Sequence, residues 1–167
     1  MSKEIEHKYL VDRIALNSYL ANHPPHSTKV IEQAYIGSSS AWSSRVRIVD
    51  NKTEAELTIK SATPELVRDE FTYSIPVNDA KAIYAKSHLK VGKNRLLITY
   101  EGRLWEVDLF HDDDLVLAET EKTHAKEKVK IPPFCTDNVT GIAAYYNENI
   151  AQRLFNKATM AVIENRA

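Results

Sequence analysis

The sequence predicts an α+β fold in which a mainly antiparallel sheet of about eight strands is flanked by helices. Segment after segment alternates polar and apolar residues with period two, which is typical of strands with chemically different faces. Short turn motifs separate these segments at the spacing of antiparallel hairpins. Other stretches carry apolar residues at helical spacing. At 167 residues the chain suits a single domain, residues 1–167, that is long enough to bury a core.

The expected strands follow from the alternating segments and from the turns between them. The turns are Gly37–Ser40, Val49–Thr53, Tyr100–Arg103 and His111–Asp114, which are rich in residues that favour turns. We therefore expect strands over the following ranges: Glu4–Val11, Lys29–Ile36, Trp42–Val49, Ala55–Ser61, Val67–Ile75, Lys93–Tyr100, Arg103–Phe110 and Leu115–Thr123.

Helices are expected at three places in the chain. The segment Asn78–Leu89 offers Asn78 as an N-cap, and we expect it to link the two halves of the sheet. A tail from about Ala143 to Glu164 repeats apolar residues every four positions, which predicts one or two amphipathic helices packed on the sheet. A shorter helix is expected near Ile14–Ala21.

The composition limits the classes of function. Charged residues make up 27% and hydrophobic residues 43%, which is typical of an ordinary folded, soluble protein. The net charge of −1 gives no sign of a nucleic-acid or membrane partner, and no apolar run approaches the length of a bilayer span. Cys135 is the only cysteine, so we expect no intramolecular disulfide, a cytoplasmic location and an inert packing role for this residue in a loop.

Charged residues recur at every second position of the expected strands, which places them on one face of each strand. The chain opens with Glu4, Glu6 and Lys8, and "SRVRI" alternates Arg45 and Arg47 with apolar residues. The same alternation continues in the later segments at the following charged or polar residues, of which the two threonines are uncharged: Glu56, Thr58, Lys60, Arg68, Glu70, Thr72, Lys93, Arg95, Glu106, Asp108, Glu119 and Glu121.

Two arrangements of the sheet produce such faces. A flat sheet with its charged side in water is the commoner case for a single strand, and Glu4 and Lys8 alone would also suit a helix surface. Neither the flat sheet nor the helix surface explains well why the charges come in like-signed pairs, because a face in water avoids repulsion when its charges have mixed signs. About eight strands closed into a barrel would bring the charged faces around a lumen that holds a small ligand, with helices covering the apolar faces.

A lumen of this kind would suit a phosphate chain together with a divalent cation. Carboxylate oxygens are preferred ligands of hard cations, and guanidinium and ammonium groups bind phosphate oxygens. The basic residues that would hold the polyanion are Arg45, Arg47, Lys60, Arg68, Lys93 and Arg95. The acidic residues that would hold the cation are Glu4, Glu6, Glu119 and Glu121. The sequence therefore predicts a triphosphate or nucleotide site with Mg²⁺ or Mn²⁺.

The ordered motifs are similar to those of a known family. They are Glu4-x-Glu6-x-Lys8, Arg45-x-Arg47, Lys60, Arg68-x-Glu70, Lys93-x-Arg95, "WEVD" and "AETE", and the similarity extends to Val139–Ala151. In this order they resemble the CYTH superfamily, also called triphosphate tunnel metalloenzymes. The resemblance implies an eight-stranded antiparallel closed β-barrel with flanking helices, whose tunnel binds a triphosphate with a divalent metal. Among its branches the chain most resembles the bacterial inorganic triphosphatases.

The resemblance also implies a role for each matching residue. The implied catalytic residues are Glu4, Glu6, Lys8 and Lys93. The implied triphosphate-binding residues are Lys8, Arg45, Arg47, Lys60, Arg68, Lys93 and Arg95. The implied metal ligands are Glu4, Glu6, Asp108, Glu119 and Glu121, with Glu70 and Glu106 in supporting positions.

The expected activity is metal-dependent hydrolysis of tripolyphosphate to pyrophosphate and phosphate. The enzyme alternatives are a class IV-type adenylyl cyclase and another organic triphosphatase, such as a thiamine triphosphatase. A non-catalytic nucleotide- or polyphosphate-binding module is the alternative of another class, because residues that many family members carry are replaced by Ser43, Thr72, Leu96, Ile142 and Ala144. Trp42 is a candidate for the tunnel mouth, where it would stack on a base. We expect a monomer or a homodimer with no nucleic-acid partner.

Overall fold

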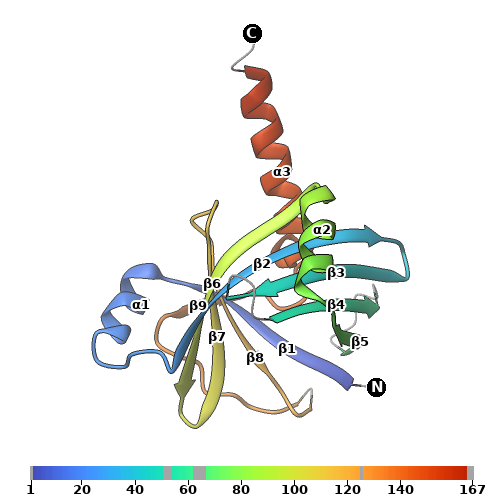
Figure 1. The fold of residues 1–167 in the computed structure, drawn as a ribbon. Helices are drawn as coiled ribbons and strands as arrows, with labels where there is room; N and C mark the ends of the chain where they lie inside the picture. Colours follow the sequence, from blue (N-terminus) through green and yellow to red (C-terminus); the bar gives the residue numbers. More distant parts are fainter. Residues whose placement is uncertain (1, 51–53, 62–66, 125, 165–167) are drawn as a thin grey trace.

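The fold is a strongly curved sheet with helices against it (Figure 1). The computed structural model describes residues 2–50, 54–61, 67–124 and 126–164, with the backbone alone for residues 2–4, 67 and 68. Over these ranges nine strands form one sheet in the order β5-β4-β3-β2-β6-β7-β8-β1-β9. The strands are β1 (Ser2–Val11), β2 (Ser27–Ser38), β3 (Trp42–Val49), β4 (Glu54–Ser61), β5 (Val67–Ser74), β6 (Leu89–Tyr100), β7 (Arg103–Phe110), β8 (Val116–Glu121) and β9 (Cys135–Asn138).

The pairing of β1 brings the two sides of the sheet together. One edge of β1 pairs with β8 from Glu6 to Leu10. Its other edge is shared, because residues 2–5 pair with β5 and the last residues pair with β9. The predicted antiparallel sheet is confirmed, but the prediction of a closed barrel of eight strands was wrong. A ninth strand is present, and among the described residues the sheet meets itself only through four register pairs between β1 and β5.

Three α-helices and one 3-10 turn accompany the sheet in the described ranges: α1 (Arg13–Leu20), α2 (Val77–Lys86), η1 (Ala143–Tyr145) and α3 (Asn147–Glu164). Helix α1 begins after Asp12, whose side chain accepts a hydrogen bond from the Ala15 N–H. The prediction of Asn78 as the N-cap of α2 was wrong. The cap is Pro76, whose carbonyl accepts hydrogen bonds from the N–H groups of Asp79 and Ala80, so the helix starts without a side-chain cap.

Apolar side chains on the outer face of the sheet pack under the helices. On the side of α1, the buried cluster includes Leu16, Trp105, Val107 and Phe134. On the side of α2, the helix residue Ala80 packs in a cluster with Ile48 and Ala55. Arg47 and Ile48 are neighbours on one strand, so their side chains point to opposite faces. The charged face of β3 is therefore the inner one.

The inner face becomes apolar at one end of the sheet. There Val91, Phe110 and Leu117 form a buried cluster with Ile150 and Ala151 from the first turns of α3. The start of α3 therefore closes this end of the interior. From residue 155 onward α3 is exposed at every described position and projects from the body (Figure 1). The predicted packing of the tail is thus correct for its first turns only.

Strand β9 and its first residue, Cys135, were not expected to be in the sheet. The segment Cys135–Asn138 is short and follows Pro132 and Pro133, so the sequence indicates a loop there. The structure pairs Val11 with Cys135 and Tyr9 with Asn138 instead. No helix in the described part of the chain combines the length and the apolar character needed to cross a bilayer.

Candidate functional site

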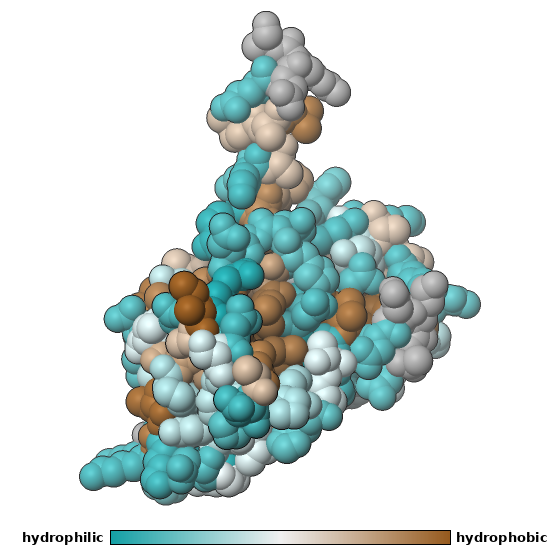
Figure 2. All heavy atoms as spheres, turned by 90° about the vertical axis from the view of Figure 1, so that its left-hand side faces the viewer, coloured by the Kyte–Doolittle hydropathy of each residue, from teal (hydrophilic) through white to brown (hydrophobic). Residues whose placement is uncertain are grey.

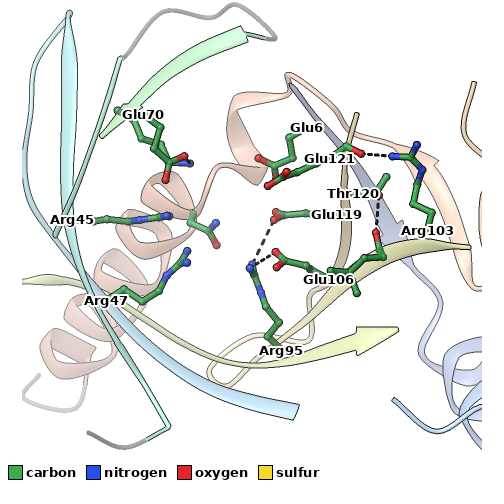
Figure 3. A pocket seen from close by; sticks show the side chains of 13 residues that line it. Glu6, Arg45, Arg47, Glu70, Arg95, Arg103, Glu106, Glu119, Thr120 and Glu121 are labelled. Atoms are coloured by element: carbon green, nitrogen blue, oxygen red, sulfur yellow. Dashed lines mark hydrogen bonds and ion pairs between the residues drawn. The ribbon is translucent and has the colours of Figure 1, made fainter. Parts of the chain in front are cut away.

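A cavity of about 520 Å³ lies inside the curved sheet. Its walls come from strands on both sides of the interior and from the first residue of α3. Figure 3 shows Arg45 and Arg47 on one side, pointing toward Glu6, Glu119 and Glu121 on the other. The residues that line the cavity are Glu6, Arg45, Arg47, Lys60, Glu70, Arg95, Arg103, Leu104, Glu106, Glu119, Thr120, Glu121 and Asn147.

The basic wall is built by β3. In "SRVRI" the strand period of two sends Arg45 and Arg47 inward and buries Val46 on the opposite face. The Nε atoms of both arginines are buried and have no hydrogen-bond partner among the described residues. Burial, together with the neighbouring Arg45 and Arg95, lowers the pKa of Arg47 to about 10. The guanidinium of Arg47 is still charged at neutral pH, and its buried donor suits an anion.

The acidic wall is built by β1, β7 and β8. The register aligns Glu6 with Glu121 between β1 and β8, and Glu106 with Glu119 between β7 and β8. Register partners in a sheet point to the same face, so these carboxylates share the interior. Glu119 is 7% exposed, whereas the side chains of Glu6 and Glu106 are 29% and 37% exposed.

Buried ion pairs hold the base of the acidic wall. Arg95 Nε lies 2.7 Å from Asp108 Oδ1, and one of its terminal nitrogens lies 2.7 Å from Asp108 Oδ2, so the pair is bidentate. Lys93 Nζ lies 2.5 Å from the same Oδ2 atom. Arg95 also donates to Glu106, and a terminal nitrogen lies 3.6 Å from Glu119 Oε2. The side chains of Lys93 and Asp108 are fully buried.

These contacts shift the pKa values of the buried groups. Burial lowers the pKa of Lys93 to about 8, with a further contribution from Arg95, although Asp108 opposes the shift. Burial alone would raise the pKa of Asp108, but Lys93 and Arg95 outweigh it and hold this pKa below its ordinary value. Burial would likewise raise the pKa of Glu119, yet the positive charges of Lys8, Lys93 and Arg95 lower it well below its ordinary value.

Lys8 supports Glu119 from the neighbouring strand. Its Nζ lies 2.8 Å from Glu119 Oε1 and 3.6 Å from Glu6 Oε1. The same ammonium donates to the carbonyl oxygen of Tyr145, 3.2 Å away, which links β1 to η1. Burial by itself would lower the pKa of Lys8, but Glu119 and Glu6 raise it above its ordinary value. Lys8 is therefore a fixed positive charge between two carboxylates.

A further ion pair lies on the β4 and β5 side of the cavity. Lys60 Nζ is 2.8 Å from Glu70 Oε2, and the two residues are register partners. Thr72 donates to Glu70 Oε1 at 3.1 Å, and its hydroxyl lies 3.2 Å from that of Thr58. The hydroxyl of Thr72 thus orients Glu70.

The structure brings most of the predicted site residues together. The predicted residues that line the cavity are Glu6, Arg45, Arg47, Lys60, Glu70, Arg95, Glu106, Glu119 and Glu121. Lys8, Lys93 and Asp108 are buried and do not belong to the lining, because they are held by partners beneath it. Glu4 and Arg68 are register partners on β1 and β5, but their side chains lie outside the described residues.

Sequence reasoning missed four lining residues: Arg103, Leu104, Thr120 and Asn147. Leu104 shares the even parity of Glu106 and Asp108, so the strand period could have found it. Asn147 is the first residue of α3, where asparagine ordinarily indicates a helix cap. Instead its Oδ1 lies 3.3 Å from Lys93 Nζ. Trp42 does not belong to the lining and is close to Phe71, with ring centroids 6.1 Å apart.

The acidic wall fits a hard divalent cation by the chemistry of its donors. Carboxylate oxygens are the ligands that Mg²⁺ and Mn²⁺ prefer, and Glu6, Glu119 and Glu121 present them to one cavity. Among the described side chains, no group of three or more His, Cys, Asp or Glu is gathered closely enough to hold an ion. The carboxylate of Glu4, a further expected ligand, is not among those described side chains.

The fold and the cavity define a class of protein in which a curved antiparallel sheet encloses a basic wall and an acidic wall that face each other. No family model matches the chain. A curated inorganic triphosphatase from Acetivibrio thermocellus is 33% identical over 156 residues, which cover 91% of this chain and 95% of that protein. The crystal structure of the inorganic triphosphatase NE1496 is 25% identical, covers 90% of this chain and 95% of its own, and superposes with a TM-score of 0.61.

More distant structures share the fold. The protein PH1012 from Pyrococcus horikoshii OT3 is 18% identical, with a TM-score of 0.57 over 72% of this chain and 80% of its own. The Hippeastrum protein HpAC1 is 16% identical, with the same TM-score and the same two coverages. The chain belongs to the CYTH superfamily of triphosphate tunnel proteins, in the branch of the bacterial inorganic triphosphatases.

Proposed function

We propose that this protein is a divalent-metal-dependent hydrolase that converts inorganic tripolyphosphate to pyrophosphate and orthophosphate. The observation that carries the proposal is the pair of buried Nε donors on Arg45 and Arg47, which face a wall of carboxylates across the cavity. A polyphosphate chain would accept hydrogen bonds from the arginines, and its metal ion would match the acids. The relatives named as inorganic triphosphatases support the same activity.

The lining favours a bare phosphate chain over a nucleotide or a thiamine ester. Leu104 is the only apolar residue among the described lining residues, and none of them carries an aromatic ring. A base or a thiazolium ring needs stacking or apolar contact to be held specifically. Trp42 packs toward Phe71 and does not line the cavity, so it offers no such contact. Inorganic tripolyphosphate is therefore the substrate we propose.

The basic residues would bind and neutralise the substrate. Arg45 and Arg47 would donate to the phosphate oxygens on which negative charge grows in the transition state. Arg95 is held by Asp108, so its guanidinium is already positioned and needs little reorganisation. Lys8 and Lys93 were expected to touch the substrate. We propose instead that they position Glu119 and Asp108, the carboxylates to which they are bound.

The acidic residues would hold the metal ion and handle the proton of the attacking water. Glu119 and Glu121, with Glu4 and Glu6, are the proposed ligands for Mg²⁺ or Mn²⁺. Such an ion, when bound, supplies positive charge to the phosphate oxygens and lowers the pKa of a bound water. Glu6 and Glu121 are more exposed than Glu119, so their carboxylates are the candidates for accepting the proton of that water.

The test is phosphate release from tripolyphosphate, ATP and thiamine triphosphate, each with Mg²⁺ and with Mn²⁺. We expect tripolyphosphate to be turned over fastest and Glu119→Gln to lower its kcat/KM by roughly a hundredfold. Cyclic AMP formed from ATP would favour the cyclase alternative, and tight binding without turnover would favour a binding module. A Glu119→Gln rate equal to the wild-type rate would end the proposed role of this wall.

Two broader expectations remain proposals alongside the activity. A cavity of about 520 Å³ suits a small molecule rather than a nucleic acid as the partner.

Cys135 is a free thiol, and burial raises its pKa to about 12, so it fits an inert packing role. A lone free thiol is typical of proteins in a reducing compartment, and we propose a cytoplasmic location on that ground.

A further inference from the structure

Beyond Phe155, whose ring centroid lies 6.1 Å from that of His88, the second half of α3 projects from the body of the protein. Ile150 and Ala151 are buried against the sheet, but every residue from Phe155 to Glu164 is exposed. Figure 1 shows this part of the helix standing away from the sheet, and Figure 2 shows apolar surface on it. Met160, Val162 and Ile163 are each more than half exposed, at 56%, 51% and 56%. Three exposed apolar side chains within four residues mark this segment as a candidate interaction surface.

The apolar stripe that anchors α3 continues into the projecting half. Ala151 and Leu154, which contact the body, recur seven residues later as Ala158 and Ala161. Val162 lies beside Ala158 on the same face, four residues further along. A seven-residue repeat of this kind is the seam of a helix that packs along another helix. In the described structure the seam ends on the body after Leu154, and its continuation packs against nothing.

A partner would stabilise the projecting half of α3, which gains little from packing on the body. Isolated helices shorter than about 12–15 residues are marginal in water, because most helical stability in proteins comes from packing of an apolar face. Ala158 and Ala161 are small, so they allow a second helix to approach closely along the seam. The seam therefore fits a helix with a similar surface.

The charges beside the seam indicate which helix would pair with it. Lys157 and Glu164 are seven residues apart, so they flank the stripe on the same side. We propose that the projecting halves of α3 from two copies of this chain pair in antiparallel orientation. Lys157 of each copy then lies opposite Glu164 of the other, with Ala161 near the centre. A parallel pairing would instead place Lys157 beside Val162 of the other copy, so it would lack both ion pairs.

The antiparallel arrangement also keeps the two bodies apart. Each helix points away from its own sheet, so the bodies lie at opposite ends of the helix pair and both cavities stay accessible. The described overlap runs only from Lys157 to Glu164. A contact this short is at the weak end of specific interfaces, so we expect a dimer that forms in a concentration-dependent way. This inference does not depend on the proposed enzymatic activity.

The test is sedimentation equilibrium of the full chain at concentrations from about 1 μM to about 1 mM, which brackets weak specific association. We expect the wild type to change from monomer to dimer over this range. Lys157→Glu and Glu164→Lys each replace two attractive pairs by two repulsive ones, and we expect each to raise the dimer Kd roughly tenfold. The double variant exchanges the charges and should restore the wild-type Kd.

Three results would overturn the inference. One is a wild type that stays monomeric across the range. Another is a dimer Kd that does not follow the charges: either the single variants keep the wild-type Kd, or the double variant binds no more tightly than the single variants. The third is binding of the monomer to anionic phosphatidylserine vesicles that Lys157→Glu abolishes, which would assign the segment to a lipid surface. Tripolyphosphate turnover and circular dichroism serve as the controls, since neither substitution touches the cavity and both should match the wild type.

Discussion

Arg45 and Arg47 differ from the buried cations Lys8, Lys93 and Arg95 in what they contact. Lys93 and Arg95 are bound to Asp108 within 2.7 Å, and Lys8 is bound to Glu119. The Nε atoms of Arg45 and Arg47 have no hydrogen-bond partner among the described residues. A buried donor without a partner is costly, and a bound anion removes that cost. At the scale of single residues, the two arginines are therefore the groups that we propose recognise the substrate.

Replacing Arg47 tests this distinction. We expect Arg47→Ala to lower kcat/KM for tripolyphosphate by roughly 10²–10³, because a preorganised charge facing the phosphate is lost. Arg153→Ala is the matched control. That arginine pairs with Asp113 on the surface, 2.5 Å away, and its side chain is 46% exposed. Steady-state kinetics check both variants, and equal rates for them would contradict the assignment of Arg47.

Replacing Asp108 tests the ion pairs beneath the cavity. Asp108→Asn leaves the buried charges of Lys93 and Arg95 without their common partner, so we expect a loss of about 3–5 kcal/mol in the free energy of unfolding. Asp113→Asn removes one partner of the surface ion pair with Arg153 and should cost less than about 1 kcal/mol. Urea unfolding measures both. Similar small losses would mean that the buried pairs do not hold the wall.

At the scale of elements, α3 has different roles along its length. Its first residue, Asn147, lines the cavity and contacts Lys93. The next turn places Ile150 in the cluster that closes the interior. The projecting half contributes nothing to the described core. The helix therefore connects the site to a surface far from it.

Substitutions at two isoleucines distinguish the anchored half of α3 from its projecting half. We expect Ile150→Ala to lower the free energy of unfolding by about 2–5 kcal/mol, because it leaves a cavity in a buried cluster. Ile163→Ala, on the exposed part, should change it by less than about 0.5 kcal/mol. Urea unfolding at low protein concentration is the measurement. A large loss for Ile163→Ala would show that the projecting half packs on the body.

An element can be predicted from the sequence when the residues that define it are close together in the chain. "SRVRI" alternates strictly, so the parity of Arg45 and Arg47 is readable from the sequence, and the structure agrees. Strand β9 has four residues and no apolar alternation, so it is defined only by its contact with β1. Asn147 enters the cavity because α3 packs on the inner face, which is a tertiary effect. Ion pairs such as Lys93 with Asp108 depend on register in the same way.

At the scale of the whole molecule, the fold reverses the usual distribution of charge. Ionic side chains fill the middle of the interior, and the main apolar clusters lie outside the sheet or at its closed end. The ion pairs of Lys8, Lys93 and Arg95 offset much of the cost of keeping these charges out of water. The stability of the protein should therefore depend on pH.

The sign of this dependence follows from Asp108 and Glu119. Both carboxyls have a folded pKa below their ordinary values of 3.8 and 4.5. On acidification the unfolded chain takes up protons first, so the free energy of unfolding falls as the pH drops through these ordinary values. We expect the urea midpoint to decline from about pH 6 to about pH 3.5. A midpoint that is constant or rises over this interval would contradict the buried ion pairs.

The most direct measurement is ³¹P NMR of tripolyphosphate incubated with the protein and Mg²⁺ or Mn²⁺. The proposed activity predicts that the tripolyphosphate signals disappear while pyrophosphate and orthophosphate appear in equal amounts, and that Arg47→Ala slows this conversion by roughly 10²–10³. Tripolyphosphate that stays intact with either metal, or that is consumed equally fast by Arg47→Ala, would contradict a charged cavity built for triphosphate hydrolysis.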